Sequence, residues 1–205
     1  MTTPSARSYS RLALSIGTVL AALFAVAIAT IASAWIESMM QMPGTALDGA
    51  PSPEFSLRDH RGARFALSDT RGKPTIVTFL YANCPDVCRL TAAGLRQTLD
   101  LLGDQADDVA IVAVSTDPNG DSPAATRQFL SRQGLSDRMR YLVGTYDELA
   151  PVWQAYHIYA GDRRDGLEAH TDAIYVLDRD GGQRAFLRSD FDPDELASAL
   201  RKLLG

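Results

Sequence analysis

The stretch that decides the fold covers residues 75–88 and reads TIVTFLYANCPDVC. Its first half, residues 75–81, is a short run rich in β-branched and aromatic side chains, which is typical of a buried strand. Leucines then recur near helical spacing, at Leu90, Leu95, Leu99 and Leu102. The only two cysteines of the chain, Cys84 and Cys88, are therefore predicted to lie between a strand and a helix.

The segments around this stretch alternate between strand and helix patterns. Phe55–Leu57 and Phe65–Leu67 alternate around the turn Asp59–Gly62, which predicts an N-terminal β-hairpin. Further strands are expected at Val109–Val114, Leu142–Val143, Ala173–Leu177 and Gln183–Leu187. Helices are expected from Ser122, from Thr145 to about Tyr156, and from Asp192 to Leu203. This order predicts an α/β fold whose loop residues meet at the carboxyl ends of parallel strands.

The N-terminal segment indicates the compartment. Residues 12–36 contain no charged side chain, and a membrane span needs roughly 20 apolar residues. Arg7 and Arg11 precede the segment, so residues 1–11 are expected in the cytoplasm and the C-terminal domain across the membrane. A cleaved signal peptide is the alternative, because Ala32-Ser33-Ala34 has the form of a cleavage site. The simpler prediction is a single-pass protein of a bacterial inner membrane, with its domain in the periplasm.

The remaining chain divides into a linker and one domain. Residues 37–53 are rich in Pro, Gly and Ala and are predicted to be a linker, and residues 54–205 suit one domain. Residues 37–205 contain 18 basic and 25 acidic side chains, a net charge of −7. No basic tract with interleaved aromatic residues occurs, so nucleic acid is not an expected partner.

The cysteine pair indicates thiol or metal chemistry. A disulfide across so small a loop would restrain the unfolded chain very little, so a structural role is weak. A helix N-terminus stabilises a thiolate, which favours a nucleophile or a metal ligand. The i, i+4 spacing of Cys84 and Cys88 would also place two sulfurs on one face of a helical turn, where they can share one soft metal ion such as Cu(I) or zinc.

Two sulfurs leave a metal site incomplete, and the chain has three histidines. His60 lies in a predicted turn, where a solvated side chain is expected. His157 lies at the end of a predicted helix, where a polar or charged helix terminus is the simpler role. His170 lies where a polar loop meets a strand, and its position makes it a candidate for the third ligand. The residues alone leave this choice open.

Three motifs together resemble the SCO/SenC family of cytochrome oxidase copper chaperones. They are Cys-Pro-Asp-Val-Cys after a β-rich run, Ser-Thr-Asp-Pro-x-x-Asp-Ser-Pro at residues 115–123, and His-Thr-x-x-Ile-Tyr-x-Leu-Asp-x-Asp-Gly from His170. The likeness covers residues 51–203. It implies a thioredoxin-like fold, and one copper ion, as Cu(I) or Cu(II), held by Cys84, Cys88 and His170. It also implies delivery to, or preparation of, a cytochrome c oxidase copper site, with the oxidase subunit as partner.

The resemblance also bears on residues beside the ligands. Asp86 lies inside the motif, where a role in supporting the ligands and a solvated loop charge fit equally well. Asp117 and Asp121 are expected to cap a loop and the next helix. Two positions depart from the family pattern: Arg89 stands where proline is frequent, and Asn83 where a small or hydroxyl residue is usual. Arg89 is expected either to lower the thiol pKa values or to dock a partner.

Other functional classes fit less well. A thiol–disulfide oxidoreductase using Cys84 and Cys88 is the main alternative, but such enzymes usually carry Cys-x-x-Cys and a facing proline. A peroxiredoxin motif fails because Val77 and Tyr81 occupy the positions of its proline and threonine. A purely structural module would leave the cysteine pair unexplained.

Overall fold

The computed structural model describes residues 20, 22–31, 42–160 and 171–205. The chain forms two compact units, residues 1–41 and 42–205. In the first unit, residues 20 and 22–31 are helical. Within the described ranges, none of the helices has the length and apolar character needed to cross a membrane. Most of the predicted anchor at residues 12–36 falls outside those ranges.

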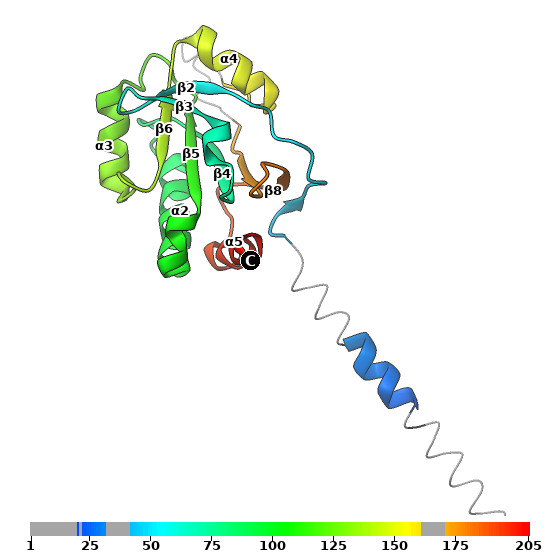
Figure 1. The fold of residues 1–205 in the computed structure, drawn as a ribbon. Helices are drawn as coiled ribbons and strands as arrows, with labels where there is room; N and C mark the ends of the chain where they lie inside the picture. The colour runs from blue at the N-terminus through cyan, green and yellow to red at the C-terminus, as the bar shows by residue number, and fades with distance from the viewer. Residues whose placement is uncertain (1–19, 21, 32–41, 161–170) are drawn as a thin grey trace, which may run out of the picture. The chain divides into compact units, whose positions relative to one another are not determined.

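The second unit is built on one mixed sheet of eight strands in the order β1-β8-β7-β4-β5-β6-β2-β3 (Figure 1). The strands are β1 (Thr45–Ala46), β2 (Ser56–Asp59), β3 (Arg64–Ala66), β4 (Thr75–Leu80), β5 (Ala110–Ser115), β6 (Arg140–Val143), β7 (Ile174–Leu177) and β8 (Gln183–Leu187). The helices are η1 (Leu67–Thr70), α2 (Val87–Leu102), η2 (Gly103–Asp108), α3 (Pro123–Gln133), α4 (Tyr146–Ala155) and α5 (Pro193–Leu204).

The centre of the sheet is parallel. β4 pairs with β5 and β5 with β6 in parallel, and the connections run through α2 and α3. The other neighbouring strands pair antiparallel. Parallel neighbours end at the same edge of a sheet, so the residues after β4 and after β5 come together there. This edge carries the cysteine loop, as the sequence predicts.

Successive side chains of the central strands point to opposite faces of the sheet, which divides the core into two layers. On β4, Ile76 and Leu80 pack into the layer formed with α2, α3 and α5, whereas Val77 and Phe79 pack into the layer that contains α4. All six residues of β4 are buried, which is the pattern of a strand covered on both faces. Cys84 and Cys88 belong to the first of these layers.

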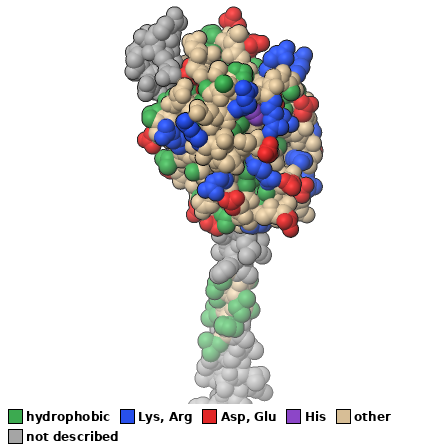
Figure 2. All heavy atoms as spheres, turned by 90° about the vertical axis from the view of Figure 1, so that its left-hand side faces the viewer, with side chains coloured by type: hydrophobic (Ala, Val, Ile, Leu, Met, Phe, Trp, Pro, Cys, Tyr) green, Lys and Arg blue, Asp and Glu red, His purple; other side chains and the backbone are tan. Residues whose placement is uncertain are grey.

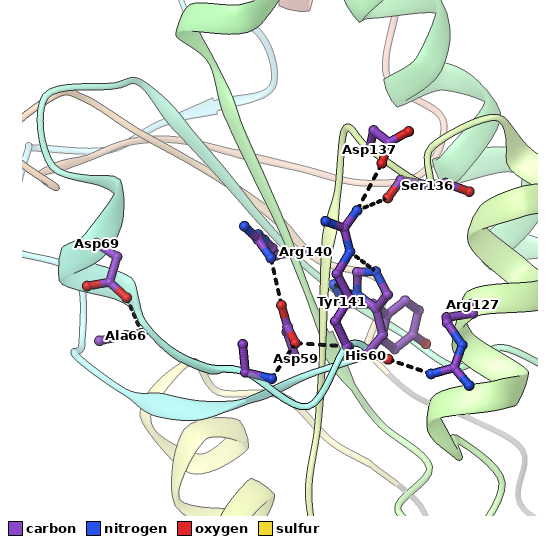
Figure 3. A network of polar contacts seen from close by, with 11 residues as sticks. Asp59, His60, Ala66, Asp69, Arg127, Ser136, Asp137, Arg140 and Tyr141 are labelled. Atoms are coloured by element: carbon purple, nitrogen blue, oxygen red, sulfur yellow. Dashed lines mark hydrogen bonds and ion pairs between the residues drawn. The ribbon is translucent and has the colours of Figure 1, made fainter.

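The hairpin β2–β3 is attached to the sheet by its turn (Figure 3). The carboxylate of Asp59 accepts hydrogen bonds from the backbone amides of Arg61 and Ala63, each 2.9 Å long, and from the Arg140 guanidinium at 2.7 Å. Burial by itself would raise the pKa of Asp59. The donated hydrogen bonds outweigh this effect, so its pKa lies below the usual value.

The prediction of a solvated His60 is wrong. Its side chain is only 2% exposed, and its backbone amide donates to the Tyr141 carbonyl at 2.7 Å. Nδ1 of His60 accepts from the Tyr141 amide at 3.3 Å, and the Arg127 guanidinium donates to the His60 carbonyl (Figure 3). Burial lowers the pKa of His60, which favours the neutral ring. Local sequence could not show this burial, because β6 supplies the partner from 81 residues away.

Several boundaries differ from the sequence prediction. Leu67 begins η1 and does not continue the hairpin strand, and β4 ends at Leu80. Within the predicted linker at residues 37–53, Thr45 and Ala46 pair with β8. Both of these side chains are exposed, so the strand has no apolar alternation that a sequence pattern could reveal.

Candidate metal centre

The cysteine loop connects β4 to α2. The Cys84 amide donates to the Tyr81 carbonyl at 3.2 Å, which closes a turn directly after the strand. Cys84 lies in this turn, before the helix, whereas Cys88 is the second residue of α2. The prediction that the pair shares one face of a helical turn is therefore wrong. The turn, and not helical spacing, brings the two residues together.

Neither cysteine is in a disulfide, and both are buried, with 4% of Cys84 and 0% of Cys88 exposed. The Cys88 backbone amide donates to Sγ of Cys84 at 3.4 Å. A backbone amide donating to sulfur fixes the position of Cys84 relative to the first turn of α2. The pair is thus held together without a disulfide.

The electrostatics around Cys88 favour its protonated form. The hydrogen bond with Cys84, and then burial, raise the pKa of Cys88 far above the usual value for a thiol. For Cys88 the expected lowering by the helix N-terminus or by Arg89 is wrong, because burial and the neighbouring sulfur dominate. A metal that binds here must displace a proton.

A buried carboxylate supports the cysteine loop from β5 and the segment after it. Oδ1 of Asp121 accepts from the Ala82 amide at 2.7 Å, and Oδ2 accepts from the hydroxyls of Ser115 at 2.7 Å and Tyr141 at 2.9 Å. Burial raises the pKa of Tyr141, and the Asp121 charge adds to the effect, so the phenol remains a proton donor. Asp121 therefore fixes the backbone two residues before Cys84.

This arrangement corrects the expected role of Asp121 in capping. Ser122 is the N-cap of α3, and its hydroxyl accepts from the Ala125 amide. Asp117 does cap a loop, as predicted, because its Oδ1 accepts from the Gly120 amide at 2.9 Å. The role of Tyr141 in this network was not predicted, since a tyrosine in a strand gives no sequence signal beyond core packing.

The third predicted ligand, His170, lies outside the described residues. Of the other histidines, His60 is buried in the hairpin turn, and His157 is exposed just after α4. No cluster of three or more His, Cys, Asp or Glu side chains suited to a metal occurs among residues 42–160 and 171–205. The described part of the site is therefore the two thiols, which suit a soft metal such as Cu(I) and need a further ligand.

Comparison with known proteins gives one consistent family. The SCO1/SenC family model matches residues 45–205. Protein SenC of Rhodobacter capsulatus is 30% identical over 150 residues, which cover 71% of this chain. The chain spans 67% of the length of SenC, 58% of protein sco1 of Schizosaccharomyces pombe and 50% of the mitochondrial SCO2 homolog of Bos taurus.

Solved structures agree with these matches. ScoI of Bradyrhizobium japonicum with copper bound is 33% identical, with a TM-score of 0.67 over 76% of this chain and 100% of that one. ScoI of Arabidopsis thaliana with copper bound is 25% identical, with a TM-score of 0.67 over 76% of this chain and 98% of that one. The mixed sheet and its helices thus have the thioredoxin-like fold of the Sco proteins.

Proposed function

This chain belongs to the SCO1/SenC family, and from that premise we propose that it is a membrane-anchored copper chaperone. It binds one copper ion, as Cu(I) or Cu(II), through Cys84, Cys88 and His170. It delivers this ion to a copper site of cytochrome c oxidase, or prepares that site to receive it. The observation that carries the proposal is the pair of thiols, not joined by a disulfide, held close together after β4.

The chemistry of the donors supports copper as the cargo. Thiolate sulfur selects soft ions such as Cu(I), and imidazole accommodates Cu(II). The ScoI proteins of B. japonicum and A. thaliana are described with copper bound, and both align with most of the domain. A bound ion replaces the thiol protons, so uptake releases protons and weakens as the pH falls.

Delivery follows from an incomplete coordination shell. Three protein ligands leave a position at which a cysteine of the acceptor can attach to the ion, so that copper passes stepwise from one set of sulfurs to the next. Oxidation of Cys84 and Cys88 to a disulfide removes both thiolates and abolishes binding. The redox state of the pair therefore controls whether the chaperone is loaded.

The proposal places the domain outside the cytoplasm. Residues 12–36 anchor the chain in a bacterial inner membrane, residues 1–11 lie in the cytoplasm, residues 37–53 include the connection to the anchor, and residues 54–205 form the copper-binding domain in the periplasm. The support is the uncharged run of 25 residues preceded by Arg7 and Arg11.

Copper titration of the purified, reduced protein tests the site. Wild type is expected to bind one copper ion, Cys84→Ser and Cys88→Ser to lose tight binding, and His170→Ala to bind more weakly. His157→Ala is the matched control and should bind as wild type does, because that side chain is exposed and outside the site. Wild type that takes up no copper would refute the function, and a His170→Ala variant as tight as wild type would refute the third ligand.

A thiol–disulfide oxidoreductase is the second candidate, since the two cysteines are in contact and not joined by a disulfide. The burial of both sulfurs counts against general activity, because thiol–disulfide exchange needs access to the attacking thiolate. Robust reduction of insulin by the copper-free protein would favour this function over the chaperone.

A further inference from the structure

A small pocket opens beside the cysteine loop. It has a volume of about 170 Å³. One wall comes from the loop and the start of α2, with Asn83 directly before Cys84 and Arg89 directly after Cys88. The other wall comes from α3 and includes Gln128, Arg132 and Gln133. A molecule bound in this pocket would therefore touch the margin of the candidate metal centre.

The pocket is basic within an acidic domain. Arg89 and Arg132 both line it, and no carboxylate does. Within residues 42–160 and 171–205, neither guanidinium forms an ion pair or a side-chain hydrogen bond. The ion pairs found there all use other arginines, which are Arg61, Arg71, Arg96, Arg138 and Arg140. Figure 2 shows Lys and Arg side chains gathered on the face to which α3 belongs.

The walls of the pocket are fixed to each other. Phe129 of α3 is 5% exposed and packs edge-to-face on Tyr141, with ring centroids 6.0 Å apart. The Tyr141 hydroxyl donates to Asp121, and Asp121 accepts from the amide of Ala82, which also lines the pocket. α3 and the cysteine loop are thus linked through one buried network. The backbone positions of Arg89 and Arg132 are therefore fixed relative to each other, and their exposed guanidinium groups can reach the same ligand.

We propose that this pocket receives a carboxylate side chain, Asp or Glu, of the protein that accepts the copper. The inference rests on the proposed chaperone function and names how the acceptor is recognised. Arginine pairs with carboxylates through two parallel hydrogen bonds, and the surrounding amides supply further donors. The volume is below the range of small-molecule sites, about 300–1,000 Å³, and suits a single side chain. Docking it would hold the acceptor against the loop that carries Cys84.

The two walls contribute differently to the specificity. Asn83 and Arg89 come from the cysteine loop and the start of α2, so this half of the pocket directly borders Cys84 and Cys88. Arg132 lies in the last turn of α3, where a cation also complements the helix dipole. If Arg132 only stabilised the end of α3, the protein would show no preference for acidic partners. A preference for acidic peptides therefore distinguishes carboxylate binding from this local role.

Binding of matched peptides to the reduced, copper-free, full-length protein in detergent tests the proposal. Three fluorescent peptides share the same sequence around one central cysteine, which is flanked by Glu, Gln or Lys. Wild type should bind the Glu peptide about three- to tenfold more tightly than the Gln peptide at low salt, the range expected for two exposed charge pairs. An Arg89→Gln, Arg132→Gln double variant should lose the preference, and an Arg89→Glu, Arg132→Glu double variant should prefer the Lys peptide.

The control removes the same charge elsewhere. Arg184→Gln with Arg188→Gln alters two arginines of the β8 region that do not line the pocket and should leave the Glu preference intact. The same loss in both Gln double variants, or no Glu preference in wild type, would overturn the inference. Because the measurement needs no copper, it can fail while copper titration succeeds, and the two proposals are judged separately.

Discussion

Asp121 shows how one buried carboxylate can position a site that it does not touch. It receives three hydrogen bonds, from the Ala82 amide and from the hydroxyls of Ser115 and Tyr141. Burial raises its pKa to about 6 because loss of water destabilises the charged form more than these three donors stabilise it. The residue thus fixes the cysteine loop while lowering the stability of the folded protein at neutral pH.

This balance predicts the effect of Asp121→Asn on the copper-free, reduced protein. The folded-state pKa of Asp121 lies above the ordinary 3.8, so its contribution to stability is present below pH 3.8 and is lost as the pH rises through about 6. Between pH 4 and 7, wild type should therefore lose about 2–3 kcal/mol of unfolding free energy relative to the Asp121→Asn variant. Urea unfolding at several pH values measures it.

Ser115→Ala provides the comparison within the same network. It removes a hydrogen bond that lowers the pKa of Asp121 but keeps the carboxyl group, so the pKa of Asp121 should rise further. The pH-dependent loss of stability seen in wild type should therefore remain and extend to higher pH. A difference between Asp121→Asn and wild type that stays constant with pH would show that Asp121 does not titrate in this range.

At the scale of elements, the hairpin β2–β3 is held by its turn as well as by strand pairing. β2 pairs with β6 through only two residues, Arg58 and Asp59. The turn adds the Asp59 carboxylate with its three donors and the backbone contacts between His60 and Tyr141. Tyr141 also donates to Asp121, so the hairpin and the cysteine loop share one strand as their support.

Asp59→Ala should consequently release the hairpin turn. The substitution leaves the amides of Arg61 and Ala63 without their acceptor and removes the partner of Arg140, which we expect to reduce the unfolding free energy by about 2–3 kcal/mol. In wild type this contribution should be lost as the pH falls below about 4. The folded-state pKa of Asp59 lies below its ordinary value, and protonation removes the charge that accepts these hydrogen bonds.

The matched control is Asp69→Ala in η1. Asp69 accepts a single amide hydrogen bond, from Ala66 at 2.8 Å, and its side chain is exposed, so the loss should be about 1 kcal/mol or less (Figure 3). Hydrogen exchange should show faster exchange at residues 61–63 in Asp59→Ala alone. Equal destabilisation by the two variants would contradict the proposed anchoring by Asp59.

At the scale of the whole molecule, the chain combines a compact unit at residues 42–205 with a separate N-terminal unit. The proposed anchor predicts that a C-terminally tagged protein stays with bacterial membranes after an alkaline wash and is digested by protease added to spheroplasts. Residues 42–205 fused behind a cleavable signal peptide should instead be released with the soluble periplasmic fraction. A shortened, soluble product from the full chain would show that the N-terminal segment is a cleaved signal.

Local sequence was sufficient for the order of the elements. Strands such as β4 and β5 are short runs rich in apolar residues, and helices α3 and α4 begin at polar caps, so both can be identified from neighbouring residues. The ends of elements were less well predicted, and strand β1 (Thr45–Ala46) was missed, because both depend on pairing with distant strands such as β8. The third ligand, His170, stays a prediction based on resemblance.

The sequence by itself therefore determined the α/β class and the place of the two thiols, since hydrophobic periodicity and residue type act over short distances. Only the tertiary structure decided that Cys88 lies within α2 while Cys84 lies in the turn before it, that His60 is buried, and that Asp121 holds the cysteine loop. It also brought Arg89 and Arg132 into one pocket. The parallel crossovers through α2 and α3 bring the cysteine loop, Asp121 and the start of α3 together at one edge of the sheet, and pairing with β6 buries His60.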